Sequence, residues 1–460
     1  MAKFTPETKE ELEALIYNEA IHLGDIDTSK ITDMRELFAV AIYRKDFSGI
    51  EKWDVSNVKD MASMFAACRN FNQDLSSWDV SKVENMACMF SGCENFNQDL
   101  SSWNTSKVEN MAYMFADCEN FNQDISGWDV GKVRNMEYMF KDCKSFNQPL
   151  GDWDVSGVEN MRGMFLCCEN FNQDLSSWDV SRATNMAYMF SYCENFNQDI
   201  SGWDVGKVKD MTAMFSGCHS FNQDISSWDV SGVENMDSMF LGCYALNQDL
   251  SSWNVSKVKY MAYMFSGCRN FNQDISNWNV SKVKDMDYMF SGCHAFNQDL
   301  SSWDVSKVEN MERMFAGCES FNQDLSFWDV SSVKNMKGMF ENCPIDNSNK
   351  PKELQELFYD NMNLEEVEII LSKLPKDLVF QALYKQEIMY KIDNDENEYE
   401  VDEKIINKSV KELYNKYIDD FSDTPMLNEH WLDELVEITD EIAEEQAEQK
   451  DKIKNKKGLK

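Results

Sequence analysis

The chain has 460 residues and a formal net charge of −37, with 43% apolar and 13% aromatic side chains. This apolar content excludes an intrinsically disordered chain. The large negative charge repels phosphate backbones, so it disfavours nucleic acid as a partner and favours basic partners or cations.

The N-terminal segment indicates a helical cap followed by a degenerate repeat. Thr8 and Glu11 have the spacing of a capping box. The apolar residues that follow share one predicted helical face: Leu12, Leu15, Ile16 and Ala20. Residues 25–38 follow the template of the later repeats. We therefore assign residues 1–46 to an N-terminal cap, because the open end of a repeat array exposes apolar surface.

The same N-terminal segment lacks the apolar run of a secretory signal, and no stretch of the chain approaches 18 consecutive apolar residues. These patterns predict a cytoplasmic protein that does not insert into a membrane.

Residues 47–343 consist of twelve units of 25 residues without an insertion. One unit, from Leu75 to Asp99, reads LSSWDVSKVENMACMFSGCENFNQD. Tryptophan marks the period, at positions 53, 78, 103, 128, 153, 178, 203, 228, 253, 278, 303 and 328. A fixed period of this length is the signature of a repeat solenoid.

Two periodicities occur within each unit. Apolar residues alternate at the end of Leu75–Val80, which predicts one short strand. Val83, Met86, Met89 and Phe90 then follow at three- and four-residue steps, which predicts a short helix or 3₁₀ turn. Stacked copies would pair their strands in parallel. The predicted fold is therefore an α/β solenoid of the leucine-rich-repeat type, with one strand and one helical return per unit.

Equivalent residues of such units stack into ladders along the array. The predicted structural ladder includes Trp53, Trp78, Trp103, Met86, Phe90, Cys93, Asn97 and Gln98. Asn-Gln occurs at all eleven junctions between units, and we expect these amides to hydrogen-bond along the solenoid axis.

The repeated pattern F-N-Q-D-L-S-x-W-D-V-S-x-V-x-N-M-x-x-M-F-x-x-C resembles the bacterial surface-protein repeat of mycoplasma lipoproteins and BspA-like leucine-rich-repeat proteins. The resemblance covers about residues 25–345. It implies a right-handed solenoid, a role in adhesion or host-protein binding, and the cell surface or secretion as an alternative location.

The period ends after Cys343, and Pro344 and Pro351 mark a boundary. Amphipathic patterns beyond it predict that residues 344–460 form an acidic all-α domain, whose first helices close the last coil of the array. The chain ends in a Lys-rich tail from Lys450, which is either a solvated end or an electrostatic docking segment.

Twelve of the fourteen cysteines occupy one position of the unit, from Cys68 to Cys343. One thiol per coil does not converge as a zinc site requires, and parallel side chains do not give the torsion of a disulfide. We expect reduced, buried thiols in this column. Cys88 and Cys167 lie outside the column, where either could be an exposed thiol.

An acidic side chain follows the tryptophan in nine of twelve units, and Asn replaces it in the others. We expect these side chains to accept backbone N–H bonds. A calcium-binding array is the less favoured alternative, because calcium prefers oxygen ligands but the glycine-rich calcium-binding repeat is absent.

Nothing in the chain indicates catalysis. The four histidines have no fixed carboxylate or serine partner, and no phosphate-binding loop or nucleophile elbow occurs. We predict a non-enzymatic scaffold that uses no cofactor and binds a protein partner. Variable positions of the unit supply the candidate binding residues: Arg162, Tyr188, Tyr288 and Arg313. The alternative function is an internal spacer that presents the C-terminal domain.

Overall fold

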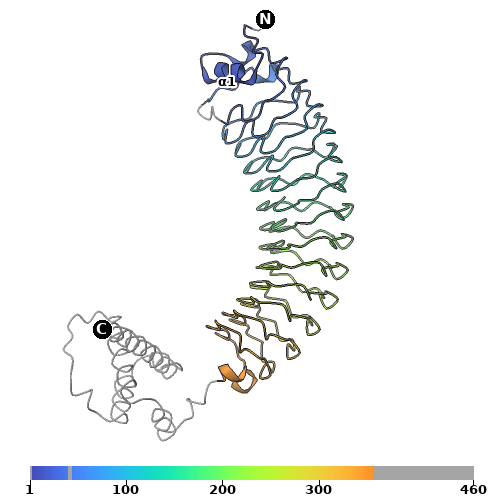
Figure 1. Ribbon diagram of the computed structural model, residues 1–460, viewed down its shortest axis with the longest axis vertical. Coiled ribbons are helices and arrows are strands. Elements are labelled where there is room, and N and C mark those ends of the chain that lie inside the picture. Colours follow the sequence, from blue (N-terminus) through green and yellow to red (C-terminus); the bar gives the residue numbers. More distant parts are fainter. Residues whose placement is uncertain (1–2, 40–43, 356–460) are drawn as a thin grey trace, which may run out of the picture. The chain divides into compact units, whose positions relative to one another are not determined.

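The computed structural model describes residues 3–39 and 44–355 (Figure 1). The chain divides into two units, Met1–Gln355 and Glu356–Lys460. The helices predicted beyond residue 355 and the Lys-rich tail lie outside the described residues. Residues 344–355 belong to the same unit as the repeats, twelve residues beyond the boundary predicted at Cys343.

Each 25-residue unit forms one coil, and the coils stack in a single row (Figure 1). Along the segment that contains Met86 and Phe90, the backbone N–H of every second residue donates to a carbonyl oxygen of the next coil. Met86 N donates to the Asn110 carbonyl oxygen at 3.0 Å, and Phe90 N donates to that of Met114 at 2.9 Å. The degenerate N-terminal copy joins the row, because Met34 N donates to the Asp60 carbonyl oxygen at 2.9 Å. The repeat solenoid predicted from the sequence is confirmed.

The predicted helical return is instead a series of tight turns. The N–H groups of Met89, Ser91 and Cys93 each donate to a carbonyl three residues earlier, and those of the intervening residues donate to the next coil. Cys88 and Gly92 have left-handed φ angles of 56° and 75°. A continuous helix would use all these N–H groups within its own coil and leave none to join neighbouring coils.

The predicted strand over residues 75–80 is also absent from the described coils. Parallel backbone pairing occurs about ten residues later, as single bridges such as Asn85–Asn110. Trp78 N donates to the Leu75 carbonyl oxygen at 3.0 Å, so this segment turns on itself instead of pairing with its neighbour. The alternation in the sequence reflects burial of Leu75, Trp78 and Val80 in an irregular segment.

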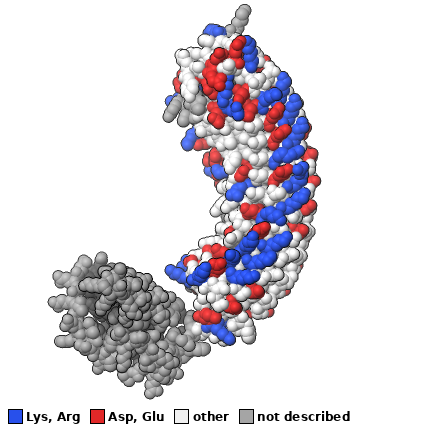
Figure 2. All heavy atoms as spheres, in the orientation of Figure 1, with Lys and Arg blue, Asp and Glu red and all other residues white. Residues whose placement is uncertain are grey.

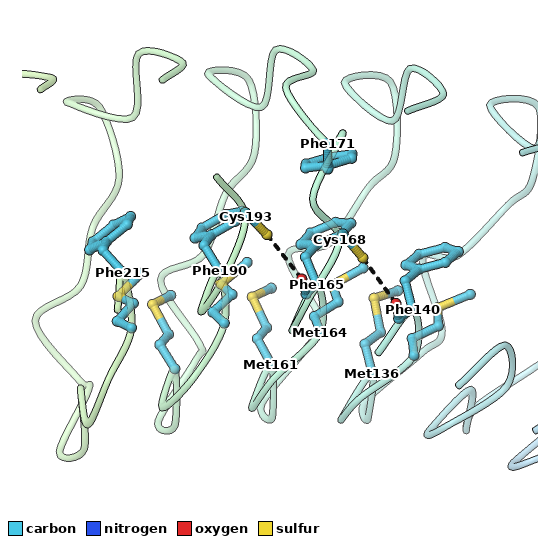
Figure 3. Packing of buried hydrophobic residues seen from close by; sticks show 14 of the residues in the cluster. Met136, Phe140, Met161, Met164, Phe165, Cys168, Phe171, Phe190, Cys193 and Phe215 are labelled. Atoms are coloured by element: carbon cyan, nitrogen blue, oxygen red, sulfur yellow. Dashed lines mark hydrogen bonds between the residues drawn. The ribbon is translucent and has the colours of Figure 1, made fainter. Parts of the chain in front are cut away.

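The core consists of stacked identical side chains from successive coils (Figure 3). Phe165 lies 4.1 Å from Phe171 of its own coil, and 5.6 Å from both Phe140 and Phe190 of the adjacent coils, between ring centroids. The tryptophan indole N–H groups donate back to the preceding coil, as in Trp103 Nε1 to the Leu75 carbonyl oxygen at 3.0 Å. The indole N–H, which is the polar group of the buried tryptophan ring, therefore has a hydrogen-bond partner.

The cysteine column has a polar role beyond filling space. The Cys193 thiol donates to the Phe165 carbonyl oxygen at 2.9 Å, and Cys168 does the same to Phe140 (Figure 3). Burial raises the pKa of Cys193 well above its ordinary value. The two cysteines outside the column, Cys88 and Cys167, are half-buried, and burial raises the pKa of Cys167 to about 11.

We expect thiol titration in denaturant, after handling without added oxidant, to return close to all 14 cysteines. Each column thiol has a carbonyl partner, and its protonated form is favoured by burial, so the reactive thiolate is scarce. A count near zero would contradict this assignment and indicate bridged cysteines.

The N-terminal cap contains α1, Lys9–Tyr17. The Thr8 side chain accepts from Glu11 N, as the capping box predicts, and Leu12 and Ile16 are fully buried. Ala20 lies beyond the helix and is exposed, so its predicted place on the buried face is wrong. Two 3₁₀ turns follow, η1 at Leu23–Asp25 and η2 at Ile50–Lys52.

Arg44 joins the helical cap to the first coil. Its buried guanidinium donates to the carbonyl oxygens of Ile16, Ile21 and Asp46 at 2.7–2.8 Å. These acceptors compensate for the loss of water around the charge.

The C-terminal end of the array is closed by η3, Asn347–Asn349, and η4, Lys352–Leu354.

Between coils, an asparagine carboxamide oxygen such as Asn72 Oδ1 accepts from Asn97 N and Gln98 Nε2 of the next coil, both at 3.0 Å. The amides therefore hydrogen-bond along the solenoid axis, as expected. The Asn side-chain oxygen accepts from the backbone N–H of the next Asn and from the side chain of the next Gln. At the last coil, Asp346 N and Asn349 Nδ2 replace these donors.

The row of coils is curved, and its inner side is the side on which the backbones of neighbouring coils pair. Ring centroids in the Phe90 column repeat at 5.5–5.8 Å along residues 65–340, whereas those of stacked tryptophans repeat at 6.2–6.5 Å. Equal coils spaced more closely on one side form an arc, which Figure 1 shows. Backbone pairing between coils runs along residues 85–92 and their equivalents, which places this segment on the closely spaced, inner side. The positions of Asn85, Ala87, Cys88, Gly92 and Glu94 and their equivalents are here called the inner face.

Candidate interaction face

The inner face contains the variable positions of the repeat, and two of them have an unusual backbone. The equivalents of Cys88 and Gly92 have positive φ throughout the described coils, a conformation that favours glycine. Five tyrosines nonetheless occupy the Cys88 position: Tyr113, Tyr138, Tyr188, Tyr263 and Tyr288, with φ of 52–61°. A bulky residue in this region costs on the order of 1 kcal/mol, and such strain is concentrated at functional sites.

The first cluster on this face surrounds Arg162. Its guanidinium carbon lies 5.9 Å from the Tyr138 ring centroid and 5.0 Å from that of Tyr188, so the cation lies between two rings. Arg162 Nε also donates to the Tyr138 hydroxyl at 3.0 Å. Gly163 makes room for this arrangement, because a Cβ there would lie 2.2 Å from Tyr138 Cε1.

The second cluster contains Tyr288 and Arg313. The Arg313 guanidinium carbon lies 6.0 Å from the Tyr288 ring centroid, and Tyr263 stacks on Tyr288 at 4.7 Å. Arg313 Nε also lies 3.0 Å from a Glu341 carboxylate oxygen. The structure thus places the four sequence-derived candidates in two pairs, Arg162 with Tyr188 and Tyr288 with Arg313.

Sequence reasoning missed a third cluster at the Glu94 position. His219 stacks on Tyr244 at 4.5 Å, and the Arg269 guanidinium carbon lies 4.8 Å from the Tyr244 ring centroid. These three residues occur at the same position of consecutive units, so their spacing of 25 was a usable signal. Tyr138 and Tyr263, which complete the other two clusters, could have been found in the same way.

Three large aromatic side chains of the inner face are strongly exposed. Tyr192, Tyr244 and Tyr260 are 51%, 39% and 43% exposed. Of these three, Tyr244 also contacts Arg269. Tyrosine and arginine are enriched at the energetically important centres of protein interfaces.

Tyr260 and Asp237 together depart from the pattern of the other coils. In most units an asparagine such as Asn85 accepts the N–H of the residue two positions later, at 3.1 Å in that coil. Tyrosine cannot do this, and Ala262 N instead donates to Asp237 Oδ1 of the preceding coil at 2.8 Å. Burial raises the pKa of Asp237 to about 6, so this replacement acceptor is electrostatically unfavourable when charged.

We expect Tyr260→Asn to raise the melting temperature, by a stability gain of up to about 1 kcal/mol, because it restores the local acceptor for Ala262 N. Thermal unfolding of the full chain measures the change. The reverse substitution in a normal coil, Asn185→Tyr, should lower the melting temperature, because Ala187 N loses its acceptor. Equal effects of the two substitutions would contradict this explanation.

Asp287 is a second carboxylate with a raised pKa. Burial raises it to about 7, with further contributions from Asp285, Asp237 and Glu312. Its buried Oδ1 has no hydrogen-bond partner among the described residues. The charged form is therefore disfavoured in the fold, and stability falls as the pH rises from the ordinary carboxyl pKa through about 7.

We expect Asp287→Asn to raise the melting temperature by about 1–3 °C at pH 8 and to have no effect near pH 4. At the lower pH the native carboxyl group is already protonated, so its replacement removes no charge. Melting curves across this range test the sign. A gain that is equal at both pH values would exclude titration of Asp287 as the cause.

The residues after the tryptophans act as local caps. In all twelve coils the Asp or Asn oxygen accepts the N–H two residues later, at 3.0–3.2 Å. Bonds from the Ser81 side chain and N–H hold the pKa of Asp79 below its ordinary value. Either residue type supplies this oxygen, which explains why Asn substitutes. Within residues 3–39 and 44–355, no three His, Cys, Asp or Glu side chains are placed to hold a metal ion.

The repeated unit also matches a family known from sequence. Residues 10–123, 78–175, 100–197, 142–253 and 242–354 match the family described as "Mycoplasma protein of unknown function, DUF285". The chain belongs to this family. Together the matches cover residues 10–354, which include residues 10–17 of α1 and every coil, and each match extends over several coils.

Comparison with individual proteins adds little to the family assignment. No curated protein matches the chain. Among solved structures, the TLR13–ssRNA13 complex is 11% identical with a TM-score of 0.22, covering 69% of this chain and 52% of that one. The functional domain of InlJ from Listeria monocytogenes, described as including a cysteine ladder, is 10% identical with a TM-score of 0.25, covering 64% and 60%. The chain thus spans little more than half of each structure.

No helix within the described residues is long and apolar enough to cross a membrane.

Proposed function

We propose that the array is a non-catalytic scaffold that binds a protein partner through its inner face. The observation that carries this proposal is the row of tyrosines in left-handed backbone conformations, held there with Arg162 and Arg313. Glycine, as at Gly163 of the same column, would relieve the strain, so the backbone conformation does not account for the tyrosines.

The curvature of the array supports the same proposal. A stacked array presents an extended concave surface to a partner, and the aromatic and arginine clusters lie on this inner side. The resemblance of the repeated sequence pattern to that of BspA-like surface proteins favours a partner on the host or on the cell surface, bound in an adhesive role.

Capture of partners by the immobilised full chain, compared between matched variants, tests the proposal. The first variant carries Tyr138→Gly, Tyr188→Gly and Tyr288→Gly. It should lose at least about tenfold in captured partner while the array keeps a cooperative melting transition, because relief of the left-handed strain offsets part of the lost ring contacts. The control carries Ser227→Gly, Ser252→Gly and Ser302→Gly. These positions lie beside the tryptophans and outside the inner face, and Gly127 and Gly202 occur there naturally. Their hydroxyls donate to the preceding coil at 2.6–2.8 Å, so the control also tests whether lost contacts between coils reduce capture.

Full capture by the tyrosine variant would refute the proposal. If capture also disappears on removal of residues 356–460, the array is instead a spacer that presents the C-terminal part. Equal loss from the tyrosine variant and its control would show that the array binds without using its inner face.

A further inference from the structure

Figure 2 shows Lys and Arg side chains beside Asp and Glu on the face of the array in view. On the inner face of the earlier coils this pairing is direct. Lys141 Nζ lies 2.7 Å from an Asp117 oxygen and 2.6 Å from an Asp142 oxygen, and Lys144 Nζ lies 2.8 Å from Glu119. These inner-face carboxylates therefore have cationic partners within the chain itself.

The inner face of the later coils differs. Within the described part of the chain, none of Asp210, Asp237, Asp285 and Asp287 forms an ion pair, although neighbouring coils contain pairs such as Lys259 with Glu234 at 2.7 Å. Asp285 and Asp210 add repulsion to Asp237, and Asp285, Asp237 and Glu312 add repulsion to Asp287. Like charges gathered without a cation destabilise the fold.

The exposed tyrosines lie on these coils or on the coils next to them. Tyr244 is in the coil of Asp237, Tyr260 is in the next coil, and Tyr192 precedes Asp210 by one coil. Tyr260 takes the place of the usual asparagine, and Asp237 supplies the missing acceptor. Tyr260 and Asp237 each differ from the residue usual at their position, and each difference is locally unfavourable. Together they place an exposed ring beside a carboxylate that has no ion-pair partner. Such departures from local consistency are expected at functional sites.

We propose that the partner of the array docks a lysine- or arginine-rich segment on the inner face from Asp210 to Asp287, with its apolar side chains against Tyr192, Tyr244 and Tyr260. This proposal rests on the function proposed above and specifies the chemistry of the partner. Cationic side chains supply the counter-charges that the array lacks, and tyrosine rings bind both cations and apolar side chains.

Binding of this kind is linked to protonation. Asp237 and Asp287 are partly protonated near neutral pH, and the titratable groups around them are Asp210, Asp285, Glu312 and Tyr263. Two cations border this cluster, since Arg162 interacts with Asp210 and Arg313 with Glu312. A bound cation favours their charged forms, so docking releases protons. Affinity for the basic segment should therefore fall as the pH is lowered through about 7 and 6.

Calorimetric titration of the full chain with an oligolysine peptide tests the proposal. The titration is done near pH 6.5, about midway between the two pKa values, in two buffers of different ionisation enthalpy. The native chain should bind the peptide and release protons, and should not bind oligoglutamate. The variant with Asp237→Asn, Asp285→Asn and Asp287→Asn should lose at least about tenfold in affinity together with the proton release. A control with Asp179→Asn, Asp204→Asn and Asp229→Asn removes three fully charged carboxylates at positions where Asn occurs naturally, so it removes at least as much charge, and it should change affinity little.

Equal losses from the two variants would overturn the proposal, because attraction would then come from the overall negative charge. Preference for oligoglutamate, or absence of oligolysine binding, would overturn it as well. In each of these cases continued loss of capture by the tyrosine variant would leave the protein-binding function standing, and only the chemistry of the partner would be wrong.

Discussion

Deletion of residues 126–150 should leave a folded array that is one coil shorter. The deletion removes one full period, so Ile125 is followed by Gly151 and every column stays in register. Coils that were next-but-one neighbours then stack through the same backbone bonds and the same phenylalanine and tryptophan ladders. The loss is one interface between neighbouring coils, and a cooperative melting transition should persist.

Deletion of residues 126–137 is the matched comparison, since it removes about half a period. The segment after the cut would place Tyr138–Leu150 against the wrong part of the preceding coil, which misaligns buried rings and leaves backbone groups without partners. We expect loss of the cooperative transition. Similar melting of the two deletion variants, measured by circular dichroism, would contradict a solenoid built on a 25-residue coil.

Replacement of one ring in the phenylalanine ladder should have the largest effect of any single substitution. Phe165 is fully buried and contacts rings in its own coil and in both neighbours. Phe165→Ala leaves a cavity that the stacked coils cannot close, at about 3–5 kcal/mol. Because the array is stabilised by contacts between neighbours, the damage should be greatest at the coils of Phe140 and Phe190.

Hydrogen exchange of the full chain measures this gradient. Amides of the coils around Phe165 should exchange faster in the variant, while those near Phe90 and Phe290 keep their protection. Phe327→Ala is the control, because its ring is 82% exposed and its loss should change stability by less than about 0.5 kcal/mol. Comparable destabilisation by the two substitutions would contradict the assignment of the core.

The period and the stacking of coils could be predicted from the sequence, because identical residues at a fixed interval have few other ways to be buried. The secondary structure within the coil could not. Val83, Met86 and Phe90 have helical spacing, but they lie in turns whose alternate N–H groups join the next coil. Local periodicity cannot distinguish a helix from turns that are stabilised by a neighbouring copy of the same segment.

The candidate site was predictable only in part. Sequence variation gave Arg162, Tyr188, Tyr288 and Arg313, but not the curvature that places these variable positions on an inner face. It did not show the left-handed backbone of the tyrosines, since most tyrosines in proteins have negative φ. It also did not show that Asp237 supports the coil of Tyr260, because the two residues belong to different units and the bond between them depends on the stacking.

Hydroxyl-radical footprinting of the full chain, alone and bound to a captured partner, tests the central claim most directly. Tyr192, Tyr244 and Tyr260 are exposed on the inner face, whereas Tyr17 lies in the cap and Phe327 beside the tryptophans on the opposite side. Our account predicts that the partner protects the three inner-face tyrosines from oxidation and leaves Tyr17 and Phe327 unchanged. Protection of Phe327 with continued oxidation of Tyr192, Tyr244 and Tyr260 would contradict it.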